Sequence, residues 1–133
     1  MQIVKVLCSM VASVAFFALL AQSDSDYQGW MKQVVASNGK LTKGIAAKDA
    51  GAAAEATTLE SVFKQVESFW SKKGASDAQA FAKQAHMAAA AAGKAINAGD
   101  FEKAAMEGKN ITATCGGCHA AHRGGEKGAF TIK

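Results

Sequence analysis

The chain has 133 residues, with 15 Lys and Arg against 11 Asp and Glu and a formal net charge of +4. This length suits one domain, because domains typically span about 50–250 residues. The basic residues are scattered and Arg123 is the single arginine, which excludes the basic stripe of a nucleic-acid-binding surface. Pro is absent and Ala dominates the middle of the chain, so helix formers prevail and we expect an all-α fold.

An uncharged apolar run, Val6–Ala21, precedes a small residue at Ser23. This pattern is typical of a secretory signal peptide over residues 1–23, with cleavage after Ser23 or after Ala21. The alternative is an uncleaved membrane anchor, but 16 residues fall short of the roughly 20 that a spanning helix needs. We therefore expect an exported, periplasmic domain over residues 24–133 without a stable membrane anchor.

Four segments with apolar residues at helical spacing follow, separated by capping residues and glycines. The first segment is expected to begin at Ser25 or Asp26, and Asp49 with Gly51 marks the break before the second segment, which ends at Gly74. Ser76 is expected to cap the third segment, which stops at Asn97–Gly99, and Asp100 opens the fourth, which ends at Gly124 and Gly125. The apolar stripe of the first segment is expected at Tyr27, Trp30, Met31, Val34, Val35, Leu41 and Ile45. Short connections predict an antiparallel up-down-up-down four-helix bundle. The third segment is mostly alanine, so such a core is thin unless something large and flat fills it.

The motif Cys115-Gly116-Gly117-Cys118-His119 has the C-x-x-C-H spacing of covalent haem attachment. At about 100° per residue, the two cysteines and the histidine share one helical face. Two thioether bonds can therefore fasten one haem edge to the helix while the imidazole of His119 ligates the iron.

The same residues are compatible with three other kinds of site. A thioredoxin-like redox pair belongs beside a βαβ pattern, which is not visible here. A zinc site that also uses His122 needs four ligands from two successive turns, which cannot easily surround a tetrahedral ion. A plain disulfide between Cys115 and Cys118 is the simplest option in an exported protein. His119, directly after the second cysteine, favours haem.

With this motif on the last of four helices, the segment 24–133 resembles the class II cytochromes c, the cytochrome c′ and cytochrome c556 family. In that family a basic residue commonly follows the histidine by four positions, and Arg123 stands there. The string Tyr27-Gln28-Gly29-Trp30-Met31-Lys32 resembles the family's first-helix pattern R-Q-x-x-M-K. The resemblance implies one covalent haem c with iron, Met31 over its distal face, and Tyr27 in place of an arginine expected to contact a propionate.

Met31 is the candidate sixth iron ligand, and its alternative is core packing over an open face, because a Met on an apolar stripe fills gaps well. Trp30 belongs to the core by default and is a candidate for lining the haem. Met87 and Met106 lie on other helices and rank lower. His86 offers a bis-histidine alternative from a boundary position. His122 shares the helix of His119 and is expected to hydrogen-bond a propionate or Arg123.

Two functions follow from the two coordination states. With His119 and Met31 as axial ligands, the protein is a one-electron carrier for redox partner proteins, and no enzyme activity is expected. With Met31 only packing, it binds a diatomic gas, NO or CO. A peroxidase-like enzyme needs a distal acid-base group that the first helix does not offer. Scattered lysines are expected to steer an acidic partner patch, and the protein is a monomer or a homodimer.

Overall fold

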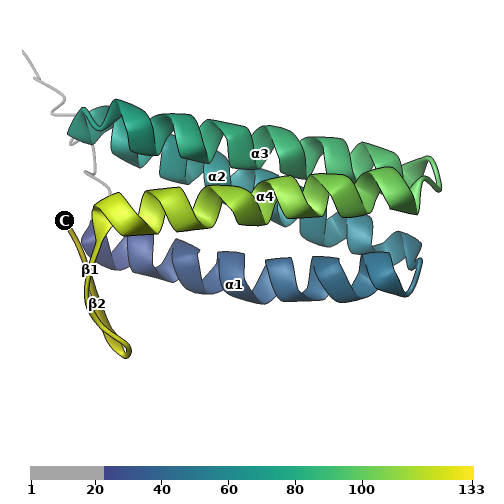
Figure 1. Cartoon of the computed structure of the whole chain (residues 1–133), viewed down its shortest axis with the longest axis horizontal. Coiled ribbons are helices and arrows are strands. Elements are labelled where there is room, and N and C mark those ends of the chain that lie inside the picture. The colour runs from purple at the N-terminus through teal and green to yellow at the C-terminus, as the bar shows by residue number, and fades with distance from the viewer. Residues whose placement is uncertain (1–22) are drawn as a thin grey trace, which may run out of the picture.

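The computed structural model describes residues 23–133, which form a mostly helical fold of four helices packed against each other. Figure 1 shows the helices side by side along the long axis of the molecule. They are α1 (Asp24–Ala46), α2 (Ala53–Lys73), α3 (Ser76–Asn97) and α4 (Phe101–His122). A short 3-10 helix, η1 (Ala50–Ala52), precedes α2. The predicted number of helices is confirmed.

The chain after α4 folds into an antiparallel β-hairpin. The expectation of an all-α fold was therefore wrong for this segment. Strand β1 (Arg123–Glu126) pairs with β2 (Ala129–Ile132). Gly125 and Gly128 have φ of +76° and +93°, conformations that favour glycine. The glycines expected to end the fourth helix therefore serve the hairpin, and α4 ends at His122.

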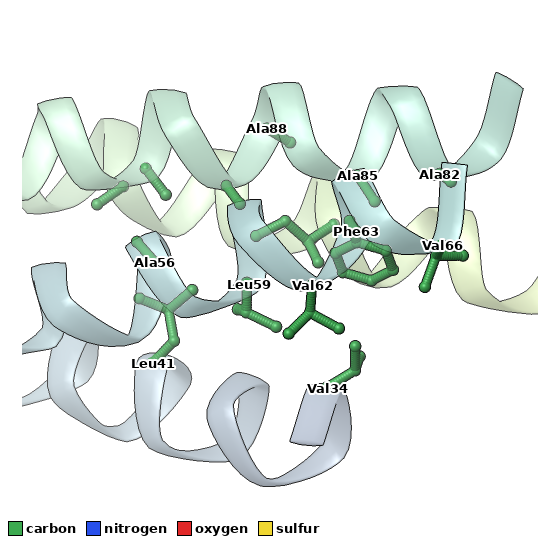
Figure 2. Packing of buried hydrophobic residues seen from close by; sticks show 14 of the residues in the cluster. Val34, Leu41, Ala56, Leu59, Val62, Phe63, Val66, Ala82, Ala85 and Ala88 are labelled. Carbon is green, nitrogen blue, oxygen red and sulfur yellow. The ribbon is translucent and has the colours of Figure 1, made fainter. Parts of the chain in front are cut away.

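The core depends on an alanine-lined helix. α3 packs extensively against both α2 and α4, whereas α1 contacts α4 over a smaller area. Small side chains on α3 let its neighbours approach closely, and Figure 2 shows three of them, Ala82, Ala85 and Ala88, beside the larger residues of α2 and α1. The largest fully buried side chains are Leu41, Leu59, Ile96 and Ile111.

Most of the predicted apolar stripe of α1 is at least partly buried, but Val35 is 75% exposed and its prediction was wrong. Val34 is buried and occupies the position that faces the core. Successive residues of a helix point about 100° apart, so the next residue turns out to solvent.

The helix starts differ by a few residues from the predicted ones. Ser23, not Ser25 or Asp26, is the N-cap of α1, and its hydroxyl accepts from the backbone N–H of Asp26 while the Asp26 carboxylate accepts from the backbone N–H of Ser23. The hydrogen bond from the Ser23 backbone N–H, and to a smaller extent the one from the Ser23 hydroxyl, holds the pKa of the Asp26 carboxyl below its usual value. Asp49 and Asp100 cap η1 and α4 as expected. Ser76 is instead the first residue of α3.

The predicted signal peptide covers residues 1–23, of which residues 1–22 lie outside the described part of the chain. Since Ser23 caps α1, cleavage after Ala21 keeps the cap and cleavage after Ser23 removes it. Among the helices of residues 23–133, none is both long and apolar enough to span a bilayer.

Ser23→Ala in protein that begins at or before Gln22 is expected to lower the free energy of unfolding by about 1 kcal/mol, because the first turn of α1 loses its side-chain acceptor. Ser25→Ala is the matched control, since the Ser25 side chain does not cap the helix. Chemical unfolding measures both. An equal effect of the two substitutions contradicts the capping role.

Candidate functional site

The C-x-x-C-H residues lie in the last two turns of α4. Cys115, Cys118 and His119 are each half-buried, and both cysteines are free thiols. Cys118 packs against the hydrophobic core, while the Cys115 Sγ lies 3.8 Å from the backbone oxygen of Ile111. Neither sulfur is used in a disulfide, so both are available for covalent attachment of a group.

Two glycines reveal which side of α4 carries the motif. A Cβ placed on Gly108 lies 3.8 Å from Ile45 of α1, so this side of α4 faces α1. Cys115 and His119 follow Gly108 by seven and eleven residues and point within about 20° of its direction. Gly117 faces the other way, since its Cβ would lie 2.6 Å from the Phe81 ring of α3. Cys115 and His119 therefore turn toward α1.

A groove between α3 and α4 has a volume of about 540 Å³ and is lined by Phe81, Met87 and Thr114 among others. It opens on the side of α4 that carries Gly117, not on the side of His119. Helix geometry and donor chemistry thus place the candidate site at the α1–α4 contact, and this groove lies outside it.

The facing side of α1 carries the first-helix candidates. Tyr27 precedes Ile45 by 18 residues, which is about five full turns, so both point the same way. Met31 points about 40° from that direction. Trp30 and Met31 are half-buried and pack against the core. The structure therefore puts Tyr27 and Met31 on the side of α1 that faces α4.

An aromatic cluster joins three helices at this end of the bundle. The Trp70 indole N–H donates to the Tyr27 hydroxyl at 3.1 Å, and the Tyr27 ring centroid lies 4.7 Å from that of Phe69. Trp70 also lies 4.6 Å from the imidazole of His122 on α4. Burial raises the pKa of Tyr27 to about 12, with the Trp70 hydrogen bond acting in the opposite sense. Tyr27 is thus a neutral core residue tied to α2.

The protonation states at the motif suit attachment of a metal-bearing group. Burial raises the pKa of Cys118 to about 11, and burial also raises the pKa of Cys115, so both thiols are neutral at pH 7. Burial, and then the nearby Arg123 charge, lowers the pKa of His119 below its usual value. The imidazole is therefore mostly neutral at pH 7, and neutral imidazole is the form that binds metal.

Two further predicted residues have other partners. The ring nitrogens of His122 pair not with Arg123 but with the Lys133 backbone oxygen, at 3.4 Å, and with the Asp77 carboxylate, at 2.8 Å from Nε2. The hydrogen bond from His122 lowers the pKa of the Asp77 carboxyl. The Arg123 guanidinium lies over the Phe130 ring, 4.2 Å from its centroid.

The lower-ranked axial ligands lie apart from the motif. His86 on α3 has its Nε2 2.7 Å from the carboxylate of Glu67 on α2. Met87 and Met106 are 57% and 63% exposed. The structure thus brings neither methionine nor His86 to the α1–α4 contact.

One residue that the sequence did not single out fits a missing group at this contact. The side-chain oxygen of Asn38 is buried and has no hydrogen-bond partner. Asn38 precedes Ile45 by seven residues and points within about 20° of it, toward α4. An unpaired buried polar atom costs about 1–3 kcal/mol and calls for a partner such as an absent ligand or water.

Among residues 23–133 no three His, Cys, Asp or Glu side chains gather as a metal cluster.

Gly117→Ala is expected to destabilise the fold by about 1–3 kcal/mol relative to Gly116→Ala, because its new methyl group meets the Phe81 ring and forces that ring to move. A Cβ on Gly116 meets nothing within 4 Å, so the same change there is harmless. Thermal unfolding of the two variants measures the difference. Equal stabilities contradict the close packing of Phe81 on Gly117.

Comparisons with family models, with curated proteins and with solved structures found no match to the chain. The functional assignment consequently depends on the residues and their geometry. Phe81 and Phe130 acquire their significance only in the folded chain, because their partners lie on other elements.

Proposed function

We propose that the protein is an exported mono-haem c-type cytochrome of the class II type that carries one electron between redox partner proteins. One observation carries the proposal: the free thiol of Cys115 and the neutral imidazole of His119 lie on the side of α4 that faces α1, and the free thiol of Cys118 lies about one turn from Cys115. Cys115 and Cys118 would hold the haem through thioether bonds, and His119 would ligate its iron. The haem supplies reversible one-electron oxidation and reduction of iron when bound.

The short connections between consecutive helices support an antiparallel up-down-up-down arrangement of α1 to α4. In that arrangement α1 and α4 run in opposite directions, and Ile45 lies opposite Gly108. His119 follows Gly108 by eleven residues and Val34 precedes Ile45 by eleven, so His119 and Val34 lie at the same level. Met31 is then three residues further along α1, about 4.5 Å along the axis. This offset is small beside a porphyrin, so Met31 is the proposed sixth ligand.

Electron transfer needs little of the chain beyond holding the iron in place. His119 and Met31 would hold the iron in both redox states, and ligation by methionine with histidine raises the potential relative to two histidines. Trp30 and the buried Tyr27 would exclude water from the α1 side. The scattered lysines would steer acidic partner proteins. No catalytic group is proposed, and residues 1–23 are the proposed signal peptide.

One observation favours a second candidate, the binding of NO or CO to five-coordinate iron. The Asn38 side chain lies at the α1–α4 contact, where its oxygen has no partner, and the NH₂ group of the same amide is the donor that a bound gas would accept from. In this case Met31 packs beside the gas and does not ligate.

The first test is the mass and spectrum of the mature protein from a host that attaches haem c. The measured mass is expected to equal that of one haem plus a polypeptide that begins at Gln22 or Asp24. His119→Ala is expected to give haem-poor protein, because the iron loses its permanent ligand. His86→Ala is the matched control, since His86 pairs with Glu67 away from the motif. Mature protein of bare polypeptide mass would refute the proposal.

Met31→Ala distinguishes the two candidate functions. If Met31 ligates, the wild-type spectrum is low-spin and the variant becomes high-spin and binds CO readily. Met106→Ala, a change at an exposed position, should leave the spectrum unaltered. A wild-type protein that is already high-spin supports gas binding. Low-spin bands that survive Met31→Ala show that another residue ligates.

A further inference from the structure

Arg123, the one arginine of the chain, follows His119 by four residues, and its charge is close enough to lower the pKa of that imidazole. The Arg123 backbone N–H donates to the carbonyl oxygen of His119, and extended backbone at Arg123 ends the helix there. The guanidinium then lies 4.2 Å from the centroid of Phe130 on β2, in cation–π geometry. Arg123 is therefore fixed at both its backbone and its side chain.

The C-terminal segment that carries Phe130 is held against the bundle by three contacts. The Gln28 side-chain amide of α1 donates to the Phe130 carbonyl oxygen at 3.1 Å. Further along, Ile132 packs against the core, and the Lys133 backbone N–H donates to the His122 carbonyl oxygen at 3.0 Å. The hairpin is thus attached to both α1 and α4, and the Phe130 ring has a defined place beneath the guanidinium.

The position of Phe130 also depends on the turn geometry of the hairpin. Gly125 pairs with Phe130 in the strand register, and a Cβ on Gly125 would lie 2.3 Å from the Ala129 carbonyl oxygen. The hairpin therefore has this form only with glycine at position 125.

No carboxylate neutralises this cation. Within residues 23–133, the ion pairs involve other side chains, and Arg123 forms none. The one acidic side chain of the hairpin, Glu126, is exposed. Its strand position is an odd number of residues from Arg123, so the two side chains point to opposite faces of the hairpin. The positive charge beside His119 is consequently uncompensated.

We propose that Phe130 is a positioning residue, which holds the Arg123 guanidinium beside His119 and so raises the reduction potential of the attached haem. The inference depends on the proposed function. Reduction adds one electron to the iron and lowers the positive charge of the site by one, so a fixed cation nearby favours the reduced form. The electron comes from the redox partner, and no bond is made or broken.

The test measures the reduction potential of the holoprotein by redox titration in four forms: wild type, Arg123→Gln, Phe130→Ala and the double variant. Both single variants are expected to lower the potential, Arg123→Gln by removing the charge and Phe130→Ala by letting the exposed guanidinium move away from His119. The double variant is expected to show a shift no larger than that of Arg123→Gln, because the two changes act through one charge. The shifts are expected to shrink at high salt.

Two controls separate positioning from simple structural loss. Phe130→Tyr keeps a ring beneath the guanidinium and should keep the wild-type potential. Lys127→Gln removes one charge from the hairpin turn without touching the stack and should shift the potential less than Arg123→Gln. If Phe130→Ala does not fold, Gln28→Ala, which frees the Phe130 carbonyl oxygen, replaces it.

A wild-type potential in Phe130→Ala, alongside a lowered one in Arg123→Gln, overturns the positioning role. Additive shifts in the double variant, or a shift in Lys127→Gln equal to that in Arg123→Gln, overturn it as well. Wild-type protein without haem refutes the proposed function itself, and mass spectrometry detects that outcome before any potential is measured.

Discussion

The packing of Trp70 joins three helices at the end of the bundle where the C-x-x-C-H motif lies. Its indole N–H donates to Tyr27 on α1, and its ring lies 4.6 Å from His122 on α4. A buried indole or phenol needs a hydrogen-bond partner, and here each satisfies the other. Because these contacts fix α1 and α4 relative to α2, the side of α4 that carries Cys115 and His119 faces the side of α1 that carries Met31.

The rest of the bundle is arranged around a helix with little side-chain volume. The alanine face of α3 packs closely against α2 and α4, whereas α1 contacts α4 less extensively. At the end with the motif, inward positions of α4 hold cysteines and histidines that are only half-buried. The unpaired oxygen of Asn38 lies at this contact as well. A flat cofactor between α1 and α4 would bury these residues.

Electrostatics at the motif agree with this interpretation. Burial lowers the pKa of His119, so its imidazole does not carry a positive charge that would oppose an iron cation. The charges that surround it come from residues placed by other elements. Asp77 on α3 is engaged by His122, and Arg123 is held by the hairpin. In the proposed cytochrome, these two residues would tune the attached iron without altering its ligands.

The sequence by itself determined the helices and the motif, because both depend on local spacing. Apolar periodicity and the caps at Asp49 and Asp100 depend on residues a few positions apart, and so does the common face of Cys115, Cys118 and His119. The β-hairpin was missed, because its short strands show little alternation and are stabilised by distant groups such as Gln28.

Only the tertiary structure decided which helix the motif faces, that Tyr27 pairs with Trp70, and that Arg123 stacks on Phe130. These facts depend on contacts between residues far apart in the chain. Local periodicity determines which face of a helix is apolar, but not which neighbour covers that face.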